Sequence, residues 1–380
     1  MQKILALCAC DVGTADMYLK LTGALSDFSG QEESWERLIH RAEQQGIAPL
    51  LYKHIRHLEF EIPANSRRLL QNLYLRNRRS NTIRNKAVIE IVSACGQEDV
   101  DVMPVKGIAL CNFAYSEIGL RPMRDIDLLV KKEDIFKAKE ILLALGYLEV
   151  ADHSIPFDYY HLAPLEKTID GLPVGIELHH NLLPFHPQYP LWPFMKSVQT
   201  SREILINETV VQTLSLEDTL YYCYLHGFQA PLTYEPYRLM HVADINSLLE
   251  KYSMVLNWHQ LNKKTVTLLT SISRFHFLTP WTPEVIQQLD VDIRKKPRGV
   301  GQPFCGWPLR KVLGSDSGNM FKLLVNTMFP SQWWMQLYYG HQEGVEYWKA
   351  RFFYHPRTIW RWIKMYWTVH LKNRKDNPGG

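Results

Sequence analysis

The sequence predicts an α+β protein, in which a small mixed sheet is flanked by N-terminal helices and by a large C-terminal helical region. Residues 1–100 carry apolar side chains at helical spacing, and the same spacing returns after residue 215. Between them, residues 101–180 hold short branched and apolar runs that are typical of strands. These strands are too few and too mixed for a doubly wound sheet. We therefore expect three parts, residues 1–100, 101–214 and 215–380.

The composition is that of a folded chain. Of the 380 residues, 46% are hydrophobic and 22% are charged, which excludes an intrinsically disordered protein. The net charge of +4 is mild and does not by itself indicate a nucleic-acid partner. The aromatic fraction is 12%, and the Trp are concentrated in the C-terminal half. Basic residues are concentrated at 67–86 and at 349–375.

The cysteines and the apolar runs favour a cytoplasmic location. The sequence contains no CxxC pairing, so we expect free buried thiols in a reducing compartment. No window reaches 18 apolar residues, so we expect no transmembrane segment. The run from Ile4 to Cys10 predicts a short opening helix rather than a signal peptide. The six cysteines are Cys8, Cys10, Cys95, Cys111, Cys223 and Cys305.

The first part is predicted to be helical. Ser34 is expected to cap a helix that ends at Gly46, and another helix follows over residues 47–57. After Pro63, residues 64–95 contain no further Pro or Gly and predict one long helix. We expect its basic residues to form a solvated face, with a polyanion-facing surface as the alternative. These residues are Arg67, Arg68, Arg76, Arg78, Arg79, Arg84 and Lys86.

The central part alternates strands with helices. A helix is expected to open at Lys106-Gly107, and a second helix covers Glu133–Leu145 with Gly146 as its C′ residue. Alternation and branched residues predict strands at Val102–Val105, Asp125–Val130, Tyr159–Leu165 and Val174–His179.

Helices return in the third part. Ser215 and Asn257 are placed to cap helices that begin at Leu216 and Trp258. Further helices are predicted over Pro236–Tyr252 and from Pro283, whereas residues 293–318 are predicted to be a loop. The tail, residues 349–375, holds eight Lys or Arg among seven aromatics and no Asp or Glu. We expect it to pack its Trp face on the domain; the alternatives are binding of single-stranded nucleic acid or of a membrane surface.

The Asp125-x-Asp127 pair carries the strongest chemical signal. Residues i and i+2 of a strand point to the same face, so both carboxylates project together. In the strand Val174–His179, the alternation places Glu177 on the face opposite the apolar residues. If the two strands are neighbours, Asp125, Asp127 and Glu177 form a three-carboxylate cluster. Such hard oxygen ligands suit Mg²⁺ or Mn²⁺, and two ions in the cluster would support in-line displacement at phosphorus.

A predicted phosphate-binding set surrounds this strand. Lys106 and Gly107 open a helix whose N-terminus presents free N–H groups, and Lys106 adds a full charge. Arg121 and Arg124 flank the strand and are expected to grip phosphate oxygens. His179 shares the acidic face and would contact a phosphate or orient a ligand.

Less specific interpretations of the same residues are open. A D-x-D pair also occurs at an exposed strand end, or where Asp125 pairs with Arg121 or Arg124. His179 would serve equally as a structural histidine. The sequence contains no Walker A motif and no G-x-G-x-x-G, G-x-S-x-G or H-E-x-x-H, so the usual hydrolase and dehydrogenase signatures are absent.

The segment from Val105 to Val130 resembles the signature of the uncharacterised nucleotidyltransferase family, which is related to DNA polymerase β-type enzymes. The matching residues are Val105-Lys106-Gly107, Gly119 to Val130, and Gly146-Tyr147. Glu177-Leu178-His179-His180 resembles a later element of the family, in which Trp is common at the place of His180. A looser likeness extends over residues 34–265. Lys106-Gly107 stands where polymerase β-type enzymes place a Gly-Ser pair, which puts the family's usual phosphate grip in doubt.

This resemblance implies an enzyme that transfers an NMP from an NTP to an acceptor and releases pyrophosphate. Asp125, Asp127 and Glu177 would hold Mg²⁺ or Mn²⁺. The acceptor would be a small molecule, a peptide or a protein. A toxin-like nucleotidyltransferase that acts on tRNA or other RNA is the first alternative. A non-catalytic partner that binds a nucleotide or peptide is the second.

Overall fold

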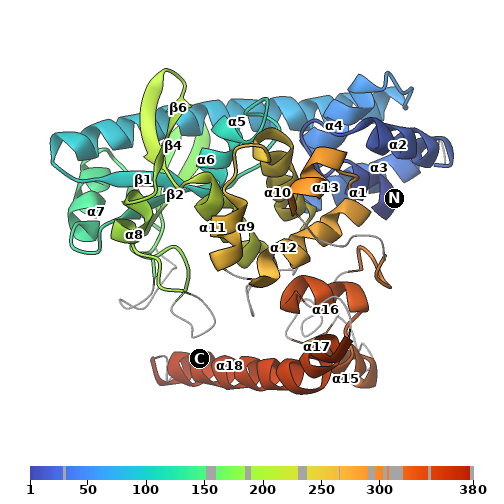
Figure 1. The fold of residues 1–380 in the computed structure, drawn as a ribbon. Coiled ribbons are helices and arrows are strands. Elements are labelled where there is room, and N and C mark those ends of the chain that lie inside the picture. Colours follow the sequence, from blue (N-terminus) through green and yellow to red (C-terminus); the bar gives the residue numbers. More distant parts are fainter. Residues whose placement is uncertain are drawn as a thin grey trace.

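The computed structural model describes residues 1–28, 31–150, 160–184, 190–229, 238–264, 266–289, 296–302, 306–307, 320–340 and 344–376. Helices surround a five-stranded mixed sheet and a separate two-stranded sheet (Figure 1). The predicted α+β class is confirmed. The division at residues 100 and 214 stays a prediction.

Five helices precede the sheet. They are α1 (Gln2–Leu7), α2 (Ala15–Ser26), α3 (Glu32–Gln44), α4 (Ala48–His57) and α5 (Ala64–Gln97). The long helix α5 has 34 residues and extends across the molecule (Figure 1). The predicted cap at Ser34 is wrong, because α3 begins at Glu32 and Ser34 lies inside its first turn. Glu32 and Glu33 favour this earlier start, since acidic side chains are stabilising at the positive end of a helix.

The main sheet has the strand order β1-β2-β5-β4-β3. Strands β2 and β5 are parallel, whereas the other neighbouring pairs are antiparallel. Alternate residues of β2 and β5, such as Ile126, Leu128 and Ile176, are fully buried on the apolar face. The opposite face is free to carry the acidic side chains. The strands are β1 (Val102–Val105), β2 (Asp125–Val130), β3 (Leu148–Glu149), β4 (Leu165–Ile169) and β5 (Leu172–His179).

A strand was predicted over residues 159–165, but β4 begins only at Leu165. The prediction is therefore wrong for the described residues 160–164. The position of β4 follows from a two-residue turn at Asp170-Gly171, where both residues have positive φ angles of 51° and 76°. This turn sets Ile169 opposite Leu172 and thereby fixes the register of the hairpin. A second hairpin was not predicted at all. It joins β6 (Arg202–Ile206) to β7 (Thr209–Thr213).

Three helices accompany the strands of the central part. Helix α6 (Lys106–Phe113) connects β1 to β2, α7 (Ile135–Ala144) follows β2, and α8 (Phe194–Val198) precedes β6. The predicted helix opening at Lys106 is confirmed. Gly146 has a φ angle of 87° after α7, as expected for a residue that ends a helix.

The helices that follow the second hairpin pack into the same core as the sheet. The hydroxyl of Ser215 accepts the Asp218 N–H, and Asn257 accepts the Gln260 N–H, so both predicted caps are confirmed. The start predicted at Pro236 and most of the loop predicted at 293–318 lie outside the described residues. The helices are α9 (Leu216–Phe228), α10 (Leu239–Tyr252), α11 (Trp258–Lys264), α12 (Val266–Ile272), η1 (Ser273–Phe277) and α13 (Pro283–Leu289).

The last helices form a layer of their own at one end of the molecule (Figure 1). A small second core lies among them, with Trp334, Tyr338 and Trp362 as its largest members. Trp362 is 3% exposed, so the expectation that the tail packs a Trp face is confirmed for this residue. No helix in the described part of the chain is long and apolar enough to cross a membrane. The elements are α15 (Met320–Met328), α16 (Gln332–Tyr339), α17 (Gly344–Lys349), the π-helical η2 (Ala350–Tyr354) and α18 (His355–Asp376).

Five of the six cysteines belong to the described residues. All five are buried and free, as predicted. Burial raises the pKa of the Cys95 thiol to about 11 and that of the Cys111 thiol to about 12. Cys305 lies outside the described residues.

Candidate functional site

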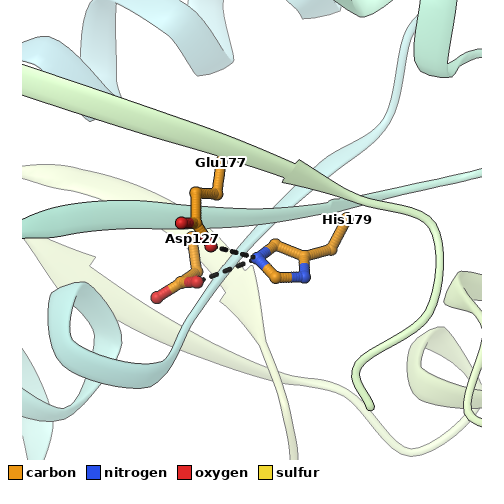
Figure 2. Close-up of side chains that lie close together, drawn as sticks. All are labelled: Asp127, Glu177 and His179. Atoms are coloured by element: carbon orange, nitrogen blue, oxygen red, sulfur yellow. Dashed lines mark hydrogen bonds and ion pairs between the residues drawn. The ribbon is translucent and has the colours of Figure 1, made fainter. Parts of the chain in front are cut away.

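The parallel pairing of β2 with β5 brings the acidic residues of the two strands together. In the register of this pair, Asp127 lies opposite Glu177 and Asp125 lies opposite Gly175. The side chains of Asp127 and Glu177 project from the same face of the sheet, and His179 joins them from the end of β5 (Figure 2). The predicted adjacency of the two strands and the shared face of their polar residues are confirmed.

His179 connects the two carboxylates. Its Nε2 lies 2.9 Å from Oδ1 of Asp127 and 3.3 Å from Oε2 of Glu177 (Figure 2). His179 is 1% exposed, and its Nδ1 has no hydrogen-bond partner among the described residues. One ligand atom each from Asp127, Glu177 and His179 lies within 4.8 Å of the others. These three residues therefore form a compact group of possible metal ligands.

Lys106 supplies the countercharge to this group. Its Nζ lies 2.5 Å from Oδ1 of Asp127. Burial disfavours the ammonium, but the attraction of Asp127 outweighs burial and raises the pKa of Lys106 well above its usual value. Burial alone would raise the pKa of Asp127, yet Lys106 and the hydrogen bond from His179 hold it well below its usual range. Asp127 therefore remains a carboxylate.

The backbone of Lys106 is unusual. Its φ angle is 55°, in the left-handed region that disfavours residues with a Cβ. A strained conformation of this kind costs on the order of 1 kcal/mol and is maintained only when its surroundings impose it. Here the buried ion pair with Asp127 compensates for the strain. Strain at the first residue of α6 thus coincides with the candidate site.

Asp125 lies on the open side of the group. It is not among the three residues within 4.8 Å of one another. Burial, followed by the like charges of Asp127 and Glu177, raises the pKa of Asp125 to about 6. Asp125 and Glu177 line a cavity of about 390 Å³ over β2 and β5. The other lining residues are Arg84, Met123, Arg124, Pro164, Glu166, Leu172, Pro173 and Gly175.

Two arginines meet at this cavity. Arg124 is exposed there, and its role as a phosphate-binding residue stays a prediction. Arg84 of α5 is 5% exposed, and its Nη2 donates to the Arg124 carbonyl at 2.9 Å. Arg84 was expected on a solvated helix face, which is wrong. The sequence contains a usable signal, because Arg84 shares the helical spacing of the apolar residues Val88 and Ile91.

Arg121 has a different environment from the one predicted. Its guanidinium forms two hydrogen bonds with Asp244 of α10, from Nε at 3.1 Å and from Nη2 at 3.0 Å. Tyr115 donates to the same carboxylate at 2.7 Å. Both partners of the ion pair are buried, and the alternative in which Asp125 pairs with Arg121 is not observed among the described residues. Arg121 thus links the loop before β2 to the C-terminal helices.

Gly107 provides the room that Arg121 needs. A Cβ at residue 107 would lie 2.3 Å from Nη1 of Arg121 and 3.1 Å from the Cβ of Met123. The absence of a side chain there is therefore explained by the close approach of Arg121. Gly107 was predicted to let a phosphate approach the backbone, and that role stays a prediction.

The donor set of the site fits a divalent cation. Asp127 is paired with Lys106, and His179 contacts both Asp127 and Glu177. Asp127, Glu177 and His179 form the compact donor set, and Asp125 lies outside it on the cavity side. Carboxylate oxygens suit Mg²⁺ and Mn²⁺. A histidine nitrogen in the group would favour a transition metal such as Mn²⁺ over Mg²⁺.

Comparisons with known proteins identify distant structural likenesses. The antibiotic-resistance factor ANT(2'')-Ia is 14% identical, with 45% of this chain and 85% of that chain covered and a TM-score of 0.32. A putative nucleotidyltransferase from Thermotoga maritima is 17% identical, covering 37% and 82%, with a TM-score of 0.28. An antigenic nucleotidyltransferase-like protein from Paracoccidioides brasiliensis is 16% identical, covering 53% and 96%, with a TM-score of 0.31. No curated protein matches.

The sequence comparison is more direct. A family model described as "uncharacterised nucleotidyltransferase" matches residues 31–272. This range includes the whole main sheet, every residue of the acidic group, and Asp244. The chain therefore belongs to the uncharacterised nucleotidyltransferase family.

Proposed function

We propose that the protein is a metal-dependent nucleotidyltransferase that transfers an NMP from an NTP to a small molecule, a peptide or a protein. The observation that carries this proposal is the register of β2 against β5, which sets Asp127 beside Glu177. Lys106 and the cavity lined by Asp125 and Arg124 adjoin this pair. The site thus combines carboxylates with cations on two neighbouring strands, as phosphoryl transfer requires.

Each residue has a role in this proposal. Asp125 and Asp127 would hold Mg²⁺ or Mn²⁺, and Glu177 would be the third ligand or the base. Bound metal, in a one-ion or two-ion arrangement, would neutralise charge on the phosphates. Lys106 and Arg124 would bind phosphate oxygens, and His179 would orient the carboxylates through its Nε2. Arg121 is a positioning residue, because its partner Asp244 lies on α10, outside the acidic group, whereas the partner of Lys106 is Asp127 within that group.

The proposed reaction is an in-line displacement at the α-phosphorus. A nucleophilic atom of the acceptor forms a bond to the α-phosphorus. The bond from this phosphorus to the oxygen bridging to the β-phosphate breaks, and pyrophosphate leaves with the electron pair. If Glu177 acts as the base, its carboxylate accepts the proton that the acceptor loses.

The proposal is tested by transfer of label from α-labelled NTPs. The full chain is incubated with each NTP, Mg²⁺ or Mn²⁺ and a cell extract, in parallel with Asp127→Asn and Asp16→Asn. Asp16 is exposed on α2 and serves as the matched control. We expect labelled acceptor with the wild type and with Asp16→Asn, and a loss of at least about a hundredfold with Asp127→Asn.

Two outcomes would contradict the proposal. Equal labelling by the wild type and Asp127→Asn would show that transfer does not depend on this site. Absence of label under every condition would favour a non-catalytic partner that binds a nucleotide or peptide. Digestion of the labelled product with nuclease or protease identifies the acceptor class.

One observation favours RNA as the second candidate acceptor. A hollow of about 730 Å³ lies along α5 and is lined by Arg78, Arg79 and Lys86. No carboxylate among the described residues forms an ion pair with these three cations. The Asp170 carbonyl accepts from Arg79 at 3.1 Å, so the hollow adjoins the β4–β5 turn. Leu172 and Pro173, the first residues of β5 after this turn, line the acidic cavity. The cations of this hollow thus lie between α5 and the acidic cavity, where they could bind the phosphates of an RNA strand.

The labelling experiment separates this candidate from the first. If RNA is the acceptor, Arg79→Gln with Lys86→Gln should lower transfer to RNA and reduce its salt dependence. Arg67→Gln with Arg68→Gln is the matched control, because both residues are exposed on the first turns of α5. Nuclease-resistant label would exclude RNA as the acceptor.

A further inference from the structure

Exposed aromatic side chains are concentrated at the end of the molecule formed by α15, α17, η2 and α18. Of the nine exposed Phe, Tyr and Trp among the described residues, eight fall between residues 321 and 367. Soluble proteins rarely leave so many large apolar side chains together in water, and such patches mark surfaces that bind a partner. The eight are Phe321, Phe329, Trp348, Phe352, Phe353, Tyr354, Trp360 and Trp367.

Helix α18 divides its residues between two faces. Ile359 and Trp362 are 8% and 3% exposed and pack into the second core. Trp360 and Trp367 are 67% and 60% exposed, and they lie seven residues apart, which places them on one side of the helix. The aromatic side chains on this outer side are therefore not required for packing within the chain.

Cations accompany the exposed tryptophans. Arg357 and Lys364 occur three or four residues from Trp360 or Trp367, so they occupy the same side of α18. Arg361 is exposed next to Trp360. Residues 349–375 contain eight Lys or Arg and no Asp or Glu. The exposed Glu346 of α17 is paired with Lys349 at 2.5 Å. This surface is thus both aromatic and strongly positive.

Two further aromatic residues extend the surface beyond α18. Trp348 and Phe352 stack with ring centroids 5.7 Å apart and remain 54% and 56% exposed. Their stacking holds both rings in a fixed orientation while leaving them open to solvent. The surface therefore continues from α17 through η2 to α18, along consecutive elements of one layer (Figure 1).

We propose that this end of the protein docks on the surface of an anionic lipid bilayer. Indole and phenyl rings partition into the boundary between headgroups and acyl chains, while Lys and Arg contact anionic headgroups. The exposed cations Lys349, Arg357, Arg361 and Lys364 complement anionic headgroups. They favour this partner over a second copy of the same chain, which would bring like charges together. No described helix crosses a bilayer, so attachment would be peripheral.

Vesicle flotation tests this proposal with the full chain. Vesicles of phosphatidylcholine alone are compared with vesicles that also contain phosphatidylserine. We expect binding to the anionic vesicles that weakens as salt is added. Trp360→Ser with Trp367→Ser should lower the partition coefficient by about tenfold or more. Leu19→Ser with Leu148→Ser is the matched control, because these residues are 74% and 71% exposed on α2 and β3.

Several results would overturn the proposal. One is absence of binding to anionic vesicles, and another is an equal loss of binding in the tryptophan variant and the leucine control. Light scattering that shows a dimer lost in the tryptophan variant, without vesicle binding, would assign the surface to self-association. Binding of single-stranded RNA at this surface without vesicle binding would assign it to nucleic acid. Circular dichroism of each variant confirms that its helices are retained.

Discussion

A buried ion pair links the loop before β2 to the C-terminal helices. Arg121 precedes β2, and Asp244 lies in the middle of α10, where it also accepts the Tyr115 hydroxyl. Removing one member of such a pair leaves the other charge uncompensated in a region of low dielectric constant. This cost explains why the loop before the acidic strand is held in place.

Asp244→Asn should therefore lower the free energy of unfolding by about 3–5 kcal/mol. Urea denaturation followed by circular dichroism measures the change. The matched control is Asp16→Asn, which breaks an exposed pair with Lys20 and should cost less than about 1 kcal/mol. The double variant Arg121→Met with Asp244→Leu should recover most of the lost stability. Equal losses for Asp244→Asn and Asp16→Asn would contradict the interpretation.

At the scale of elements, the start of α6 is packed too tightly for any side chain at residue 107. Gly107→Ala would place a Cβ 2.3 Å from Nη1 of Arg121, so the guanidinium must move away from Asp244. We expect a loss of about 1–3 kcal/mol in unfolding free energy. Gly23→Ala in α2 meets nothing within 4 Å and should stabilise the protein by about 0.5–1 kcal/mol. Thermal unfolding of both variants checks this difference in sign.

The strands differ in how well the sequence predicted them, and the reasons are local. β2 and β5 carry long alternating or apolar runs, so their positions and acidic face were predictable. β4 has the partly exposed sequence Leu-Glu-Lys-Thr-Ile, whereas the preceding aromatic run suggested an earlier strand. The Asp170-Gly171 pair was the better signal, because two positive φ angles select such a turn. Asn207, with a φ of 52°, marks the β6–β7 turn in the same way.

Alternation along the strands predicts which side chains of β2 and β5 share a face. It does not predict contacts between segments that are far apart in the sequence. Asp127, Glu177 and His179 follow from the period of two. The partner of Arg121 lies 123 residues away in α10, and the spacing of neither segment reveals the other. Arg84 belongs to a helix that also carries exposed cations, and only its helical spacing with Val88 and Ile91 distinguishes it from them in the sequence.

For the molecule as a whole, buried histidines couple stability to pH. His54 lies in α4 and His241 lies in α10, which are far apart in the sequence. Burial lowers the pKa of each histidine to about 4. His54 is held between the Tyr18 hydroxyl at 2.9 Å and the Cys10 carbonyl at 2.9 Å. In the unfolded chain both imidazoles would bind a proton near pH 6.5. Acidification therefore favours unfolding.

We expect the free energy of unfolding to be fully maintained above about pH 6.5 and to fall as the pH decreases toward about 4. Each such histidine contributes a slope of about 1.4 kcal/mol per pH unit in this window, because the unfolded state binds one more proton. His54→Gln should reduce the slope by about that amount, while His40→Gln, at an exposed position on α3, should leave it unchanged. Urea titrations at several pH values provide the measurement. An unchanged slope in His54→Gln would contradict the assignment.

The parallel pairing of β2 with β5 also has a consequence for synthesis of the chain on the ribosome. Asp127 emerges well before Glu177 and His179, so the acidic group is incomplete until about the middle of translation. The ion pair of Arg121 forms later still, because its partner Asp244 lies on a helix that is synthesised after β5. A nascent chain released before α10 would contain every carboxylate of the site but lack the charge that anchors the loop beside them. Premature termination before α10 would therefore leave Arg121 without its partner.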